Sequence, residues 1–270
     1  MDNFVFELAR TVRFCIDLTG QANDPAAAGR HNTFAGWPSM AGVGAYYEMD
    51  VVCRGKADPV TGYMMNISQI DKAVRQHALP IVTKAVHARS LIAPGTVLAS
   101  ILPALQPALG GAVHSIRWRL TPYYCVAMNA VAPDRVLISQ QFEFAAAHRL
   151  QVDSLSAEQN RAIFGKCNNP NSHGHNYRIE PQVSTPLESG AGLTLPELEK
   201  IVDETIIQRF DHKHLNRDTA EFAKVNPSVE NIARVCHDLL VQPIAQAGGV
   251  LERVRIWETE KTSCTYPAGE

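Results

Sequence analysis

The sequence predicts an α+β fold, a four-stranded antiparallel sheet with two helices inserted at its middle and packed on one face. Two observations in the C-terminal half lead to this fold. Apolar residues alternate in its first and last segments, and two stretches between them carry apolar residues at helical spacing. The N-terminal half repeats this order more weakly. We therefore expect two domains, residues 1–133 and 134–270, each with the element order ββααββ.

The first strands of the C-terminal half surround a polar connection. Residues 135–147 form the first predicted strand, and His148 follows near its end. Residues 150–164 are the connection, with room for a short helix, and the second strand contains Tyr177. The apolar residues that alternate along the two strands are Val136, Ile138, Phe142, Phe144, Ile179 and Val183.

Two helices and two further strands complete this half. Thr194 and Glu197 form a capping box that starts the first helix. The apolar face of this helix consists of Leu198, Val202, Ile206 and Phe210. Pro227 opens the second helix, and strands over 250–257 and 262–266 follow.

The N-terminal half has the same succession. Residues 46–55 are a strand, and residues 58–66 form a turn. Ile70 begins a helical apolar face, Pro94 opens a second helix, and residues 115–120 form a later strand. The halves therefore follow one plan.

Composition excludes several classes of protein. Hydrophobic residues make up 46% of the chain, and the net charge is −2, so we expect a globular protein without a nucleic-acid partner. Prolines and glycines interrupt the most apolar stretch, residues 91–113, which argues against a membrane span. No basic segment followed by an apolar run stands at Met1–Phe4, so we do not expect secretion, and the six cysteines form no Cys-x-x-Cys pair. We expect a reducing, cytoplasmic setting.

The most informative stretch contains Cys167, His173 and His175. In a strand, residues two apart project from the same face, so the two imidazoles of the His-Gly-His can meet at one point. Such a pair suits a divalent transition metal, zinc first, although a catalytic zinc usually needs a third protein ligand. The nearby thiol is a candidate acid, base or nucleophile.

Five motifs in the C-terminal half carry a family resemblance. Residues 164–177 read FGKCNNPNSHGHNY and residues 211–216 read DHKHLN. The remaining motifs are FAAAHRL at 144–150, SVENIA at 228–233 and Glu-Thr at 258–259. In this order they resemble the 6-pyruvoyl-tetrahydropterin synthase and 6-carboxy-tetrahydropterin synthase family of the tunnelling-fold superfamily. The resemblance implies tandem tunnelling folds (T-folds), with the catalytic domain second.

The resemblance also implies roles for individual residues. His148, His173 and His175 would be the zinc ligands, and Cys167 would abstract a proton. Asp211 and His212 resemble its charge-relay partners, although they could also be a solvent-exposed pair at a helix end. His214 and His237 are interpreted as surface or core residues rather than ligands.

Three further residues are candidates for binding the substrate. By the resemblance, Glu258 anchors the pterin by accepting from its ring N–H and 2-amino groups, with Thr259 beside it. Glu230 is either a substrate contact or a charge that complements a helix N-terminus.

The implied reaction converts 7,8-dihydroneopterin triphosphate to 6-pyruvoyl-tetrahydropterin with loss of triphosphate. Zn²⁺ is the only cofactor expected. The alternative within the family is the 6-carboxy-tetrahydropterin reaction, which cleaves the side chain. Family members in that reaction typically have a shorter spacing between the cysteine and the His-Gly-His. A further alternative is a non-catalytic assembly protein.

The N-terminal domain is expected to be a degenerate copy. Val43 and Ala45 stand where ligands would lie, Leu120 at the position of Glu258, and Val97 at that of Glu230. Such a domain binds neither zinc nor pterin. Because family sheets close side by side into barrels of several subunits, we expect a homo-oligomer.

Overall fold

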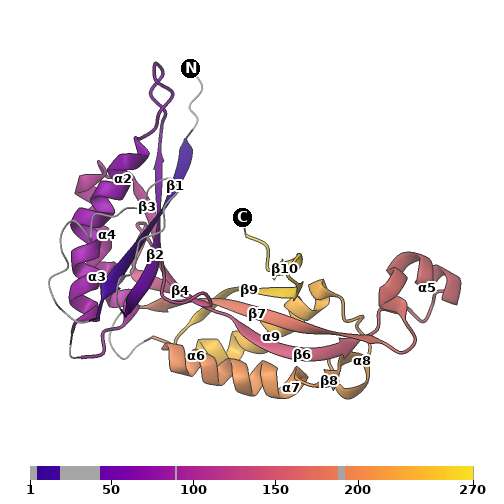
Figure 1. The fold of residues 1–270 in the computed structure, drawn as a ribbon. Helices are drawn as coiled ribbons and strands as arrows, with labels where there is room; N and C mark the ends of the chain where they lie inside the picture. The colour runs from indigo at the N-terminus through magenta and orange to yellow at the C-terminus, as the bar shows by residue number, and fades with distance from the viewer. Residues whose placement is uncertain (1–4, 19–42, 89, 188–191, 270) are drawn as a thin grey trace. The chain divides into compact units, whose positions relative to one another are not determined.

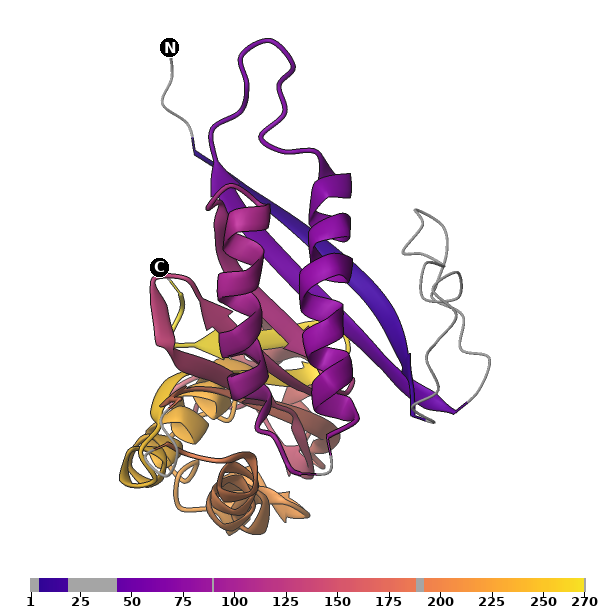
Figure 2. The same cartoon turned by 90° about the vertical axis from the view of Figure 1, so that its left-hand side faces the viewer.

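The computed structural model describes residues 5–18, 43–88, 90–187 and 192–269. The chain divides into two compact units, Met1–Leu137 and Ile138–Glu270. Strand β5 (Ala132–Gln140) contains the division. Each unit is an antiparallel sheet with helices on one face, so the expected α+β class is confirmed (Figures 1 and 2).

The second unit contains the elements that build the candidate site. Its sheet has the order β6-β7-β9-β10 with every neighbouring pair antiparallel, and the short β8 pairs in parallel with the other side of β6. The strands are β6 (Phe142–His148), β7 (His173–Pro186), β8 (Lys213–His214), β9 (Val250–Thr259) and β10 (Thr262–Tyr266). The helices are α5 (Ala157–Phe164), η2 (Gly165–Asn168), α6 (Leu195–Val202), η3 (Asp203–Ile207), α7 (Gln208–Phe210), α8 (Leu215–Asp218) and α9 (Val229–Gln246).

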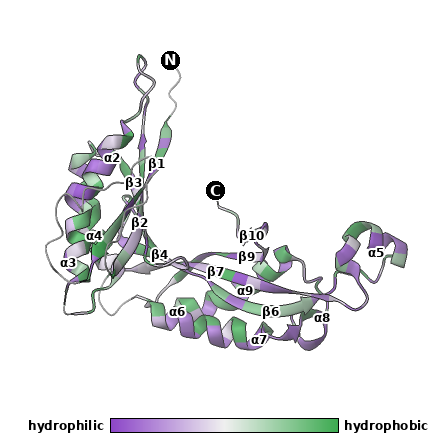
Figure 3. Cartoon of the chain, in the orientation of Figure 1, coloured by the Kyte–Doolittle hydropathy of each residue, from purple (hydrophilic) through white to green (hydrophobic). Residues whose placement is uncertain are grey.

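The first predicted helix of this unit is one continuous helical segment, α6-η3-α7, with a π-helical turn at its middle. Its start is fixed as expected, because the Thr194 backbone N–H donates to the Glu197 carboxylate at 2.8 Å. All four residues of the predicted apolar face are fully buried, including Phe210, which packs against Phe144 and Phe222. Helices in both units show hydrophilic and hydrophobic residues along their length, as amphipathic helices do (Figure 3).

Two boundaries differ from the sequence prediction. The first strand is divided at Gln141 into β5 and β6. The second helix begins at Val229 with Ser228 as its N-cap, because the Ser228 hydroxyl accepts from a backbone N–H of the first turn. Pro227 therefore precedes the helix, and its carbonyl can accept a hydrogen bond from a residue outside the helix.

The first unit has the sheet order β1-β2-β3-β4, again with every pair antiparallel. Its strands are β1 (Phe6–Asp17), β2 (Gly44–Gly55), β3 (Val113–Arg119) and β4 (Tyr124–Asn129). Its helices are α2 (Ile67–Ala73), η1 (Val74–Ala78), α3 (Leu79–Val86) and α4 (Pro94–Ala108). Here too a π-helical turn, η1, interrupts the first helical segment. None of the helices among the described residues is long and apolar enough to cross a membrane.

Phe210 provides a test of this packing. We expect Phe210→Ala to destabilise the second unit by about 3–5 kcal/mol, because a fully buried ring would leave a cavity between two aromatic neighbours. Ile163→Ala, at a residue that is 62% exposed, should change stability by less than about 1 kcal/mol. Denaturant unfolding followed by near-UV circular dichroism measures both. Equal effects of the two substitutions would contradict the packing described here.

Candidate metal centre

Three histidines converge at one end of the β6–β7 pair. His148 is the last residue of β6, and the antiparallel register places it opposite His173, the first residue of β7. His175 lies two residues further along β7 and thus on the same face as His173. One ring nitrogen from each histidine lies within 4.8 Å of the others, and His148 is fully buried. The structure therefore brings together the three histidines that the resemblance had selected.

Hydrogen bonds orient the buried imidazole of His148. Its Nδ1–H donates to the Pro227 carbonyl at 2.7 Å, and the Tyr177 hydroxyl lies 3.3 Å from the same nitrogen. Nε2 of His148 is consequently left as a lone-pair donor, and it lies 3.1 Å from Nε2 of His173. A metal-bound histidine commonly has such a carbonyl behind it, which fixes the tautomer and the ring orientation.

The electrostatics of the cluster favour neutral imidazoles. Burial lowers the pKa of His148 to about 4, although the Pro227 carbonyl acts in the opposite direction. Burial also lowers the pKa of His175, although the negative charge of the Glu258 carboxylate acts to raise it. Only a neutral imidazole has a lone pair to give to a metal, so both shifts prepare the cluster for coordination.

The cluster also fits a metal because some of its polar atoms lack partners. Within the part of the chain that the structure describes, the buried atoms His175 Nε2 and His173 Nδ1 have no hydrogen-bond partner. Each unpaired buried group costs about 1–3 kcal/mol. A cation held by three imidazole nitrogens would compensate part of that cost, and three neutral imidazoles are a donor set typical of catalytic zinc.

Glu258 brings a carboxylate to the open side of the cluster. Its Oε1 lies 3.6 Å from His148 Nε2 and 3.8 Å from His175 Nε2, and the side chain is 18% exposed. Pairing of β9 with β7 places it there, since Trp257 lies opposite Arg178 and Glu258 is the next residue. A partly buried carboxylate next to the imidazoles can accept hydrogen bonds from a ligand that enters the site.

The other two candidate substrate residues lie differently. Thr259 is at the end of β9, where its hydroxyl accepts from the Lys261 backbone N–H in the turn to β10. Glu230 is in the first turn of α9, consistent with the interpretation that its charge complements the helix N-terminus. Among the described residues, no contact joins either side chain to the three histidines.

Cys167 lies in the short helix η2, before the loop that leads to His173. The Leu150 backbone N–H donates to the Cys167 carbonyl at 2.9 Å and thereby fixes this residue. Burial raises the pKa of the thiol, and the negative charge of Glu258 raises it further. In a single chain the thiol therefore stays protonated at neutral pH and is a weak base.

Asp211 and His212 form a pair on the outer side of β6. His212 Nδ1 lies 2.7 Å from the Asp211 carboxylate, and the His212 side chain is 83% exposed. Asp211 also accepts from the Ala145 backbone N–H at 2.8 Å, and this bond is the main cause of its lowered pKa. The His212 N–H donates to the Ala145 carbonyl in turn, so backbone bonds hold the pair against β6.

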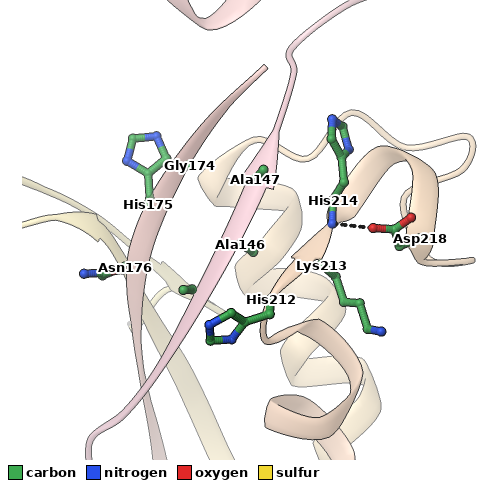
Figure 4. A pocket seen from close by; sticks show the side chains of 10 residues that line it. Ala146, Ala147, Gly174, His175, Asn176, His212, Lys213, His214 and Asp218 are labelled. Carbon is green, nitrogen blue, oxygen red and sulfur yellow. Dashed lines mark hydrogen bonds between the residues drawn. The ribbon is translucent and has the colours of Figure 1, made fainter. Parts of the chain in front are cut away.

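His212 and His175 both line a pocket of about 600 Å³ beside β6 (Figure 4). Cys167 is not part of its lining. Within the described residues, no hydrogen bond connects Cys167 to Asp211 or His212. The three residues expected to act as a catalytic relay thus lie in two separate places on one chain.

Sequence reasoning missed three groups that support the cluster. Tyr177 continues the alternation of His173 and His175, so the period of the strand could have indicated it. The Pro227 carbonyl is a backbone atom and left no signal in the sequence. His214, interpreted as a surface or core residue rather than a ligand, lies 2.7 Å from the Ser172 hydroxyl. His237 instead packs on Tyr266.

Known proteins resemble the second unit. A family model described as 6-pyruvoyl tetrahydropterin synthase matches residues 137–269. The human 6-pyruvoyl tetrahydrobiopterin synthase is 40% identical over 133 residues, which is 48% of this chain and 89% of that protein. The Drosophila melanogaster protein of the same name is 35% identical over 131 residues, 48% of this chain and 77% of that protein.

One solved structure also resembles part of this chain. The Caenorhabditis elegans 6-pyruvoyl tetrahydropterin synthase is 32% identical in sequence, with a TM-score of 0.46, over 50% of this chain and 96% of that chain. The identity to the human protein extends over nearly its whole length and matches the unit that holds the three histidines. This chain therefore belongs to the 6-pyruvoyl tetrahydropterin synthase family and is, by that membership, an enzyme of the lyase class.

Proposed function

We propose that the chain is a zinc-dependent lyase that converts 7,8-dihydroneopterin triphosphate to 6-pyruvoyl-tetrahydropterin with loss of triphosphate. The observation that carries the proposal is the convergence of His148, His173 and His175 next to the Glu258 carboxylate. Both parts that the reaction needs, a Lewis-acid site and an anchor for the pterin ring, thus lie within one cluster of a chain that belongs to this family.

Zinc suits this cluster best among the common metals. The three candidate ligands are all imidazoles, a donor set that favours zinc over the hard cations magnesium and calcium. When bound, zinc would polarise the side-chain hydroxyls of the substrate and acidify the adjacent C–H bond. The residues of the chain would bind the pterin and move the proton.

Glu258 is the proposed anchor for the pterin. Its carboxylate can accept from the ring N–H and the 2-amino group together, a paired arrangement that fixes the ring plane. Its Oε1 lies 3.6 Å from His148 Nε2, so a pterin held by this carboxylate would lie beside the metal centre. Thr259 and Glu230 are proposed only as secondary contacts, since neither touches the cluster.

Cys167 is the proposed proton acceptor, with Asp211 and His212 as its relay. In the single chain the thiol has a raised pKa, and the exposed His212 lies elsewhere on the surface. A relay that works therefore requires a second copy, whose Asp211–His212 pair would approach Cys167. This requirement supports the proposal of a homo-oligomer with active sites at subunit junctions.

We propose that the first unit is a T-fold copy that has lost the site. The β1–β2 register pairs Phe14 with Tyr47 at the place where β6–β7 pairs Phe144 with Tyr177, and each pair packs ring against ring. The aromatic core of the strand pair is thus present in both units. Both units also carry a π-helical turn in their first helical segment, at η1 and at η3.

The same registers identify the residues that replace the site. Asp17 pairs with Gly44 as Ala147 pairs with Gly174, so the next positions, Leu18 and Val43, correspond to His148 and His173. At the remaining positions, Ala45 corresponds to His175 and Leu120 corresponds to Glu258. Counted from the start of each helix, Gly95 rather than Val97 corresponds to Glu230. These positions offer neither a metal ligand nor a carboxylate.

Product analysis tests the proposed reaction. We expect the zinc-loaded protein to release triphosphate and 6-pyruvoyl-tetrahydropterin from dihydroneopterin triphosphate, as measured by mass spectrometry. His175→Ala should lower zinc content and reduce the rate by at least about 100-fold, because it removes one of three ligands. His237→Ala is the matched control. Release of acetaldehyde would instead identify the 6-carboxy-tetrahydropterin reaction. A wild-type rate in His175→Ala would overturn the assignment of the metal site, whereas no turnover by the zinc-loaded wild type would favour an assembly protein.

The electrostatic link between Glu258 and Cys167 gives a second test. Because the carboxylate charge raises the pKa of the thiol, Glu258→Gln should lower that pKa and increase the thiolate fraction at neutral pH. Alkylation of Cys167 by iodoacetamide in the metal-free protein, followed by peptide mass spectrometry, should become about two- to fivefold faster. Glu260→Gln removes an exposed carboxylate nearby and should leave the rate unchanged. A slower reaction in Glu258→Gln would contradict this account.

Mixing two inactive variants tests whether the relay crosses between chains. Cys167→Ala and His212→Ala should each be nearly inactive, whereas a co-expressed equal mixture should regain about a quarter of the wild-type rate. Half of the chains then offer a thiol and half of their neighbours offer an imidazole. Size-exclusion chromatography must show that the mixture forms the same oligomer as the wild type. A mixture no more active than its components would mean that the relay does not cross a subunit junction.

A further inference from the structure

We propose that His214 is a positioning residue for the metal centre: its imidazole holds Ser172, and thereby the loop that presents His173. The inference rests on the metal site of the proposed function, and it concerns a residue that the sequence had placed outside that site. The loop between Cys167 and His173 is held at its two ends by different contacts.

The beginning of this loop is held by backbone and amide bonds. The Leu150 N–H donates to the Cys167 carbonyl at 2.9 Å, and the Asn168 side chain donates to the Leu150 carbonyl at 2.8 Å. Asn168 is buried. The thiol end of the loop is therefore fixed independently of His214.

The other end depends on Ser172, the residue directly before His173. Its φ angle is 65°, in the left-handed region that residues other than glycine rarely adopt, so this conformation needs support from its surroundings. One support is local, since the Ser172 N–H donates to the Asn169 carbonyl at 2.9 Å. Among the residues that the structure describes, its side-chain partner is His214, whose Nε2 lies 2.7 Å from Ser172 Oγ.

His214 is itself fixed with respect to the first metal ligand. It pairs through β8 with Ala147 of β6, the residue before His148. Its backbone N–H donates to the Asp218 carboxylate at 2.8 Å (Figure 4). The contact from His214 to Ser172 thus connects β8, which pairs with β6 beside His148, to the end of the loop directly before His173. It adds to the β6–β7 pairing by holding the residue at which β7 begins.

The two ring nitrogens of His214 have different environments. Nδ1 is buried and lacks a hydrogen-bond partner among the residues that the structure describes. A buried N–H without an acceptor is rarer in proteins than a buried acceptor without a donor, so the proton belongs on Nε2. Nε2–H then donates to Ser172 Oγ. The side-chain amide of glutamine can place a donor at about the position of Nε2, whereas alanine cannot.

The test measures metal binding rather than turnover. We expect His214→Ala and Ser172→Ala each to weaken Zn²⁺ binding by on the order of tenfold, measured by competition with a chromophoric chelator. The double variant should be no weaker than either single variant, because both remove the same contact. His214→Gln should recover most of the affinity. His237→Ala, at a histidine that packs on Tyr266, should bind Zn²⁺ as the wild type does.

A spectroscopic readout separates positioning from a purely structural role. The visible absorption of the Co²⁺-loaded protein reports the coordination geometry and should change in His214→Ala but return in His214→Gln. The inference is overturned if His214→Ala lowers the unfolding midpoint while Zn²⁺ affinity and the Co²⁺ spectrum stay at wild-type values. It is equally overturned if the losses in the double variant add. Because no readout uses the pterin, failure of the proposed reaction would leave these results unaffected.

Discussion

The antiparallel pairing of β6 with β7 is the constraint on which the candidate site depends. It places His148 opposite His173, and the strand period then brings His175 and Tyr177 to the same face. A slip by one residue would turn every one of these side chains to the other face of the sheet. Burial of Phe144 and Tyr177 behind the histidines opposes such a slip, because both rings would have to leave the core. The metal cluster is therefore a consequence of core packing.

Burial of the site has opposite consequences for its nitrogen and sulfur groups. For His148 and His175 it lowers the pKa, which leaves neutral imidazoles that can coordinate a cation. For Cys167 it raises the pKa, which favours the protonated thiol. Such a thiol must lose its own proton before it can accept one. In the single chain, the imidazoles are therefore in the form that coordinates a cation, whereas the thiol is not in the form that accepts a proton.

The two units differ at the positions of the candidate site, whereas their aromatic core positions agree. Phe14 and Tyr47 occupy the places of Phe144 and Tyr177, whereas Leu18 and Val43 occupy those of His148 and His173. A sheet needs the aromatic pair to bury its face, but it does not need the histidines, which cost free energy when buried without a ligand. A unit without the histidines can therefore keep its fold, and this supports the proposal that the first unit is a T-fold copy that has lost the site.

Local patterns along the chain predict the α+β class, the apolar helix face that ends at Phe210 and the capping box at Thr194, because periodicity and capping are local properties. Together with the motifs of the family, they also indicate all three histidines. Long-range packing establishes that the Pro227 carbonyl orients His148, that His214 contacts Ser172, and that Cys167 and His212 lie apart on one chain. These contacts join residues that are distant in sequence or involve backbone atoms. No pattern along the chain records them, because they arise when separate elements pack together.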